Sequence, residues 1–243
     1  MGFYESIAQY YDQIFPVGGE QLHFLSETAG RPPKRVLDVA CGSGEYSLAL
    51  AGRGYQVTAV DLDTAMIQQV REKARQAGIP VEAMQADMLN LTEQVASDFD
   101  LIFCIGNSLV HLDGLEPIKR FLAKVRQLLR TGGQAVFQII NYDRILSQQI
   151  TALPTITNEQ TGLRFERNYR WDSAAGKVLF HTILSVGSEK VENTIPLFPL
   201  ESTDFAAALQ GAGFGKVQWY GDFHEGKFDR ELSTLQVVRA AEQ

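Results

Sequence analysis

The distribution of apolar and polar residues changes character once along this chain, near residue 150. Before that point, short apolar runs alternate with segments in which apolar residues recur every three or four positions. This order is typical of a parallel sheet whose strands are joined by helices. The expected strands are 34–39, 56–61, 81–86, 99–105 and 134–140, and the expected helices are 3–15, 19–29, 44–53, 63–77 and 117–129.

After residue 150 the pattern becomes an alternation of apolar and polar residues. Two alternating runs, 163–171 and 178–186, are separated by the turn-like residues 172–176, as in antiparallel strands. The remaining expected elements are a helix at 202–210 and strands at 217–220 and 232–238. We therefore expect an α/β fold, with a seven-stranded, mostly parallel sheet and an antiparallel β insertion after the fifth strand.

The size and composition narrow the class of protein. The 243 residues suffice for one sizeable α/β domain with an embellishment. We assign the core to residues 1–149 and 199–243, with helices in the first 30 residues, and the insertion to residues 150–198. The net charge of −7 disfavours a general nucleic-acid binder, which normally carries a basic excess.

The location and the cysteines add further expectations. No apolar run is long enough to predict a membrane span, and the N-terminus lacks the pattern of a secretory signal. We therefore expect a cytoplasmic protein. Cys41 and Cys104 lack disulfide or metal-ligand spacing, so we interpret both as small buried apolar residues and expect no metal.

The clearest chemical signal lies in residues 36–63, where two apolar runs end in the acids Asp38 and Asp61 around a glycine-rich turn. Such a unit binds a nucleoside, because glycines let the backbone approach the ligand and the second carboxylate bonds ribose hydroxyls. An NAD-binding turn would have a third glycine where Ser47 stands, and an acid before the glycines would repel a pyrophosphate. S-adenosylmethionine (SAM), which has an ammonium group and no phosphate, suits Asp38 better.

These residues resemble the glycine motif of the class I SAM-dependent methyltransferases, a family with a Rossmann-like sheet. The resemblance covers nearly the whole chain, although Ala40 stands where many members have Gly. It implies that Asp61 binds the ribose, Asp87 binds the adenine amino group, and Met88 packs on the adenine ring. The SAM contacts that we expect are Tyr11, Asp38, Ala40, Gly42, Asp61, Leu62, Asp87, Met88 and Ile105.

Three segments, 104–112, 141–146 and 220–223, are also similar to the glycine and sarcosine N-methyltransferases. In that subfamily the equivalents of Asn107 and His111 line the active site. The acceptor-side candidates are therefore His111, Asn107 and Asn141. Because a free histidine titrates near neutral pH, His111 is interpreted either as a general base or as a positioning residue.

The chain departs from this subfamily at Ile140, where the subfamily has an Arg for the substrate carboxylate. We therefore expect an acceptor larger or less acidic than glycine. The insertion offers three alternatives for that arginine, which the sequence does not distinguish: Arg164, Arg167 and Arg170.

The N-terminal residues Tyr4, Ala8 and Tyr11-Asp12 resemble a segment that folds over bound SAM in many small-molecule methyltransferases. The alternative is that these rings only fill space between helices.

The function that follows is methyl transfer from SAM to a small-molecule nucleophile, more readily nitrogen than oxygen, with S-adenosylhomocysteine as the product. Two other classes stay open, a non-catalytic SAM-binding sensor or interaction protein and an NAD-dependent oxidoreductase. The sequence also leaves open whether the protein is a homo-oligomer.

Overall fold

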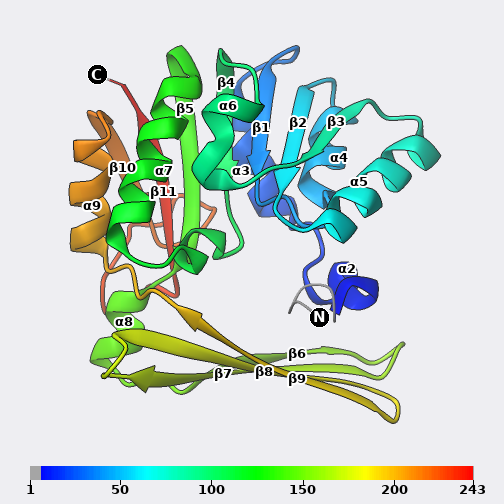
Figure 1. Ribbon diagram of the computed structural model, residues 1–243, viewed down its shortest axis with the longest axis vertical. Coiled ribbons are helices and arrows are strands. Elements are labelled where there is room, and N and C mark those ends of the chain that lie inside the picture. Colours follow the sequence, from blue (N-terminus) through cyan, green and yellow to red (C-terminus); the bar gives the residue numbers. More distant parts are fainter. Residues whose placement is uncertain (1–6, 243) are drawn as a thin grey trace.

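The computed structural model describes residues 7–242, except the side chain of Ala8 (Figure 1). The described residues form a seven-stranded sheet in the order β10-β11-β5-β4-β1-β2-β3. β11 is antiparallel to both of its neighbours, whereas the pairs formed among β1 to β5 are parallel. The strands are β1 (Arg35–Val39), β2 (Gln56–Asp61), β3 (Val81–Gln85), β4 (Phe99–Cys104), β5 (Leu129–Ile140), β10 (Lys216–Tyr220) and β11 (Leu235–Ala241). This architecture confirms the expected α/β fold.

Helices cover both faces of this sheet (Figure 1). Alternation along β1 explains why: Val36 packs with helices α3 and α4 on one face, while Leu37 and Val39 pack with α7 and α9 on the other. The buried strands thus read as continuous apolar runs. The helices of the core are α3 (Gly19–Ala29), α4 (Glu45–Ala51), α5 (Thr64–Ala77), α6 (Leu91–Gln94), α7 (Leu115–Leu128) and α9 (Ser202–Gly211).

Three local features differ from the expectation. β5 begins at Leu129, because the glycine-rich turn at 130–133 is absorbed into the strand as an irregularity in its pairing with β4. β11 begins at Leu235 rather than residue 232, because the Asp229 carboxylate accepts the backbone N–H of Leu232 at 3.0 Å and holds a turn there. The short helix α8 (Tyr142–Ser147), which starts at the capping residue Asn141, was not predicted.

The insertion forms a separate four-stranded antiparallel sheet that lies across the carboxyl ends of the parallel strands (Figure 1). Its strands are β6 (Ala152–Asn158), β7 (Leu163–Asp172), β8 (Lys177–Val186) and β9 (Glu189–Leu197). The central pair, β7 and β8, contains the two alternating runs of the sequence. The outer strands β6 and β9 were not predicted individually, since their polar faces weaken the apolar signal.

The N-terminal segment packs against this second sheet. It consists of η1 (Ala8–Tyr10) and α2 (Tyr11–Ile14), and Ile7 and Ile14 share a small apolar cluster with Phe165 of β7. Part of the expected helix 3–15, including Tyr4, lies outside the described residues. Within the described residues, no helix combines the length and the apolar character needed to cross a membrane.

Candidate active site

A cavity of about 750 Å³ lies at the carboxyl ends of the parallel strands, with walls from the main sheet, the N-terminal segment and the insertion. In an α/β sheet this edge is where ligands bind, because the loops that follow successive strands meet there. All the SAM contacts expected from the sequence, and two of the three acceptor-side candidates, are in the wall of this cavity.

The glycine-rich turn after β1 forms one end of the cavity. The Asp61 carboxylate accepts the backbone N–H of Gly42 at 2.8 Å and that of Asp63 at 2.9 Å, so it fixes the turn to the end of β2. Gly42 has a φ of +55°, and a Cβ on it would lie 2.7 Å from the Tyr11 hydroxyl. The glycine is therefore needed both for the conformation and for the close approach of Tyr11. Ala40 also has a positive φ of 58°, which explains why Gly is favoured at that position.

Asp38 lies beneath this turn and is only 3% exposed. Its carboxylate accepts a hydrogen bond from the Ser47 hydroxyl at 2.7 Å. Burial raises the pKa of Asp38 to about 7, and the neighbouring Asp61 adds to the rise. Ser47, which stands where an NAD-binding turn would have its third glycine, thus has a defined role in satisfying Asp38.

The next two strand ends supply a mixed polar and apolar wall. Leu62 follows β2 and is 66% exposed, an unusual position for a large apolar side chain. Asp87 follows β3, accepts the backbone N–H of Leu89 at 2.8 Å, and so starts the short helix η2 (Met88–Asn90). Leu62, Asp87 and Met88 all face the cavity.

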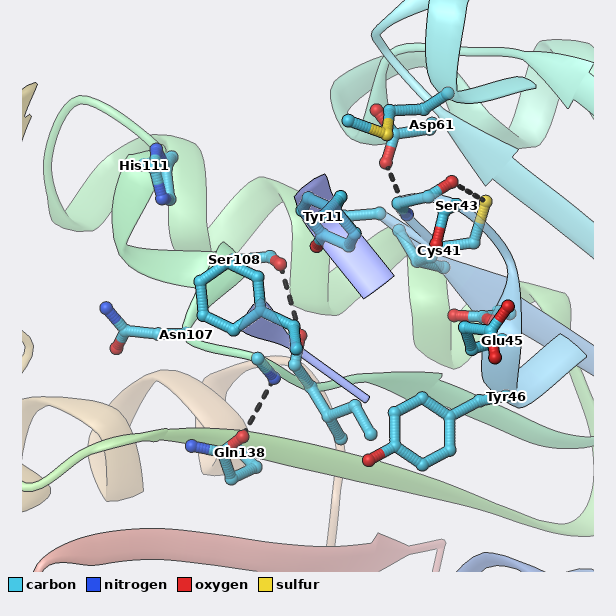
Figure 2. Close-up of a pocket in the computed structure, with 18 of the residues that line it drawn as sticks. Tyr11, Cys41, Ser43, Glu45, Tyr46, Asp61, Asn107, Ser108, His111 and Gln138 are labelled. Carbon is cyan, nitrogen blue, oxygen red and sulfur yellow. Dashed lines mark hydrogen bonds between the residues drawn. The ribbon is translucent and has the colours of Figure 1, made fainter. Parts of the chain in front are cut away.

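The segment after β4 lies across from the glycine-rich turn. Figure 2 shows Asn107, Ser108 and His111 on this segment, with Tyr11 between it and the turn in this view. Asn107 has a φ of 68° and is held firmly, since its side-chain oxygen accepts the N–H of Ile140 at 3.0 Å and its amide nitrogen donates to the Tyr142 hydroxyl at 3.2 Å. Asn107 therefore joins the ends of β4 and β5 as well as lining the cavity.

His111 ends the short helix η3 (Ser108–His111) and faces the same cavity. Burial lowers the pKa of His111 to about 4. The imidazole is therefore neutral at physiological pH, and one of its nitrogens can accept a hydrogen bond. A base with such a low pKa has little driving force to remove a proton from a neutral hydroxyl group.

Asn141 is not part of the cavity wall that the described residues form. It is 1% exposed, and its amide nitrogen donates to the carbonyl oxygens of Arg230 and Ser233, each at 2.9 Å. The side chain thus ties α8 to the turn before β11. This geometry gives Asn141 a structural role, outside the wall to which Asn107 and His111 belong.

The insertion closes the cavity with residues on one face of its sheet. Of the three arginine alternatives, Arg167 lines the cavity, whereas Arg164 and Arg170 are exposed on the opposite face of β7. Tyr169 and Phe180 also line it, and their ring centroids are 5.3 Å apart.

Several wall residues were missed by sequence reasoning. Gln138 is 7% exposed, and its side-chain oxygen accepts the N–H of Gly106 at 2.8 Å, which orients the end of β4. Its signal was available, since it is a polar residue within the apolar run of β5. Tyr46, Phe15 and Phe223 gave no such signal, because aromatic residues fill cores as often as they line sites. Among the described residues, no group of three or more His, Cys, Asp and Glu side chains is arranged to hold a metal.

Comparison with known proteins finds methyltransferases by sequence and by structure. Residues 36–133 match a family model described as a methyltransferase domain. The glycine/sarcosine N-methyltransferases of Aphanothece halophytica and Halorhodospira halochloris are each 28% identical to this chain. The alignments cover 83% and 82% of this chain, and 74% and 72% of those proteins. A SAM-dependent methyltransferase structure from Clostridium acetobutylicum has the same fold, with a TM-score of 0.81, 19% identity and 99% coverage of both chains.

Together these matches support a class I SAM-dependent methyltransferase. The prediction from the glycine motif is therefore confirmed, as are the assignments of an enzyme and of SAM as its methyl donor. This assignment takes the place of the alternative function, an NAD-dependent oxidoreductase. It agrees with Ser47, which stands where an NAD-binding turn would have its third glycine.

Proposed function

We propose that this methyltransferase methylates an amine of a small molecule. The observation that carries the proposal is the neutral imidazole of His111 at the wall of the same cavity as the strand-end acids. An amine that has lost its proton carries a lone pair that can attack the methyl carbon of SAM, with S-adenosylhomocysteine as the leaving group. Such an acceptor needs mainly orientation. A hydroxyl acceptor would need a stronger base than an imidazole whose pKa is about 4.

The donor side of the cavity fits SAM. Asp38 is a buried carboxylate with no Lys or Arg partner among the described residues, so it suits the ammonium group of the methionine part. Asp61 would hold the ribose, and Asp87 the adenine amino group. The adenine ring would pack against Leu62 and Met88, with Ala40, Gly42, Ile105 and Tyr11 completing the wall. When bound, SAM supplies an activated methyl group on its sulfonium.

The acceptor side is formed by the segment after β4 and by the insertion. His111 accepts a hydrogen bond from the amine and directs its lone pair, while Asn107 holds the segment in register with β5. The insertion, residues 150–198, covers the acceptor, and the N-terminal segment covers the donor side at Tyr11. Both covers exclude water from the reacting groups. The names of the glycine/sarcosine N-methyltransferase relatives support an amine as the acceptor.

The test has a binding step and a turnover step. Calorimetry is expected to show micromolar SAM binding and no NAD binding. A panel of small amines and the corresponding alcohols, incubated with SAM, is then analysed by mass spectrometry for a gain of one methyl group. Methylated amines with unchanged alcohols support the proposal. SAM binding with no product from any amine would instead favour the non-catalytic sensor, and methylated alcohols alone would contradict the role given to His111. The cytoplasmic location stays a prediction.

A further inference from the structure

Arg167 is a cation in an otherwise apolar part of the cavity. It lies on β7 between Phe165 and Tyr169 on the inward face of the insertion sheet. The neighbouring positions on the paired strands are Leu153 of β6 and Thr182 of β8. Among the described residues of the cavity wall, Arg167 is the single Lys or Arg, while the acids of the wall come from the core, on the donor side.

The guanidinium of Arg167 is incompletely paired. One terminal nitrogen donates to the carbonyl oxygen of Pro154 at 2.6 Å, which anchors the side chain against β6. The Nε–H is buried and has no acceptor among the described residues. No carboxylate of the described residues forms an ion pair with this side chain. Arg167 is partly buried, and a charge that is withdrawn from water without a counterion is costly to the folded protein, so such a group is normally retained where a ligand completes it.

We infer that Arg167 binds a carboxylate of the methyl acceptor, so that the acceptor is an amino acid whose amine faces His111. This inference rests on the proposed amine acceptor and adds a carboxylate as the second functional group of that acceptor. A planar guanidinium carries several N–H donors in a fixed geometry that matches a carboxylate. One arginine in an apolar wall balances a single negative charge, which favours a carboxylate over a doubly charged phosphate ester.

Ile140, at the end of β5, lines the same cavity, and the described core residues of its wall include no Lys or Arg. The acceptor must reach from the segment after β4 to the inward face of β7, past Tyr169 and Phe180, which favours an amino acid with an apolar or aromatic body over glycine.

The experiment compares matched acceptors in the whole enzyme. The panel contains glycine, β-alanine, 4-aminobutyrate and phenylalanine, each beside its carboxamide, with methylation followed by mass spectrometry. The wild type is expected to prefer carboxylates by about 10- to 100-fold in kcat/KM, the range for one hydrogen bond to a charged group. Arg167→Gln should remove this preference by raising KM for the carboxylates alone, and Arg167→Lys should restore part of it. Arg170→Gln, on the exposed face of the same strand, should keep the wild-type preference.

The outcomes separate this inference from the proposed function. Equal kcat/KM for carboxylates and carboxamides in the wild type, or an equal loss on both in Arg167→Gln, would overturn the role of Arg167 and leave the amine acceptor standing. If no amine is methylated while SAM still binds, the proposed function fails. Calorimetry with the same panel on enzyme saturated with S-adenosylhomocysteine then tests Arg167 directly. Carboxylate binding that Arg167→Gln abolishes would support the inference, and the absence of carboxylate binding would overturn it.

Discussion

The two sides of the cavity are built by different principles. On the proposed donor side, each acid that we expect to bind SAM lies within two residues of the end of a parallel strand, and backbone N–H groups bond Asp61 and Asp87. On the acceptor side, the wall combines the segment after β4 with one face of a separate sheet. The donor side is thus a local property of the sequence, whereas the acceptor side depends on which face of a distant sheet turns inward. Substitutions on the two sides should separate into effects on SAM and effects on the acceptor.

The largest effect is expected from Asp61→Ala. This substitution removes the acceptor of the Gly42 and Asp63 N–H groups and the proposed ribose contact at the same time. SAM affinity should fall by about 100-fold or more, because several hydrogen bonds to a charged group are lost together. Calorimetry with SAM measures the change, and Glu93→Ala, an exposed acid on α6, is the control. A loss below threefold would argue against the ribose contact.

Asp38 should make SAM binding depend on pH. The pKa of this carboxyl is about 7, and the ammonium group of SAM requires its charged form. Affinity should therefore fall by about tenfold for each pH unit below 7. Titrations at pH 5.5, 6.5 and 7.5 check this slope, which Asp38→Asn should flatten. Any slope that remains reports Asp61, since burial raises the pKa of that carboxyl too.

The raised pKa of Asp38 has the opposite effect on the stability of the ligand-free protein, which should decrease as the pH rises. Because the folded pKa of Asp38 lies above the unfolded value of about 3.9, the folded chain holds a proton that the unfolded chain releases. Stability should therefore decrease as the pH rises from about 4 to about 7. Asp38→Asn should raise the Tm of the ligand-free protein at pH 7.5 while it weakens SAM binding. A lower Tm in this variant would show that the Ser47 contact outweighs the burial of the charge.

His111→Gln should lower kcat by about tenfold, because the variant loses the one hydrogen bond that orients the acceptor. The ratio of the two kcat values should stay constant between pH 6 and 8, because the pKa of His111 is about 4 and the wild-type imidazole is already neutral. SAM affinity should not change. A ratio that varies with pH over this range would indicate a histidine that titrates during turnover.

The smallest effect concerns the contact between the N-terminal segment and the donor side. Asp12 accepts hydrogen bonds from the Ser43 hydroxyl and from the Lys73 ammonium, which also pairs with Glu45 at 2.7 Å. Lys73→Gln should weaken SAM binding by about two- to fivefold, because these groups are partly exposed and water screens them. High salt should reduce the difference between variant and wild type. A loss that high salt does not reduce would show that Lys73 acts through packing rather than through its charge.

The two sides also differ in how far the sequence predicted them. The sequence could bring Asp38, Gly42 and Asp61 together at one end of the cavity because the unit that positions them is contiguous. The sequence did not reveal the structural role of Asn141, because a capping asparagine and a substrate-binding asparagine look alike until the contacts with Arg230 and Ser233 are seen. The sequence did not distinguish Arg167 from the other two arginines. The alternation of side chains along a strand defines two faces, but it does not show which face is covered. The start of β11 was missed because Leu232, an apolar residue, is 76% exposed in a turn.

The N-terminal segment touches both sides at once. Tyr11 lies on Gly42, and the ring of Phe15 is 5.9 Å from that of Phe165 in the insertion. A ligand that shifts this segment from one side therefore changes the surface that the other ligand meets. The affinities for donor and acceptor are then not independent, and linkage makes the factor the same in both directions. The connection between the two sides consists of five residues, Tyr11 to Phe15.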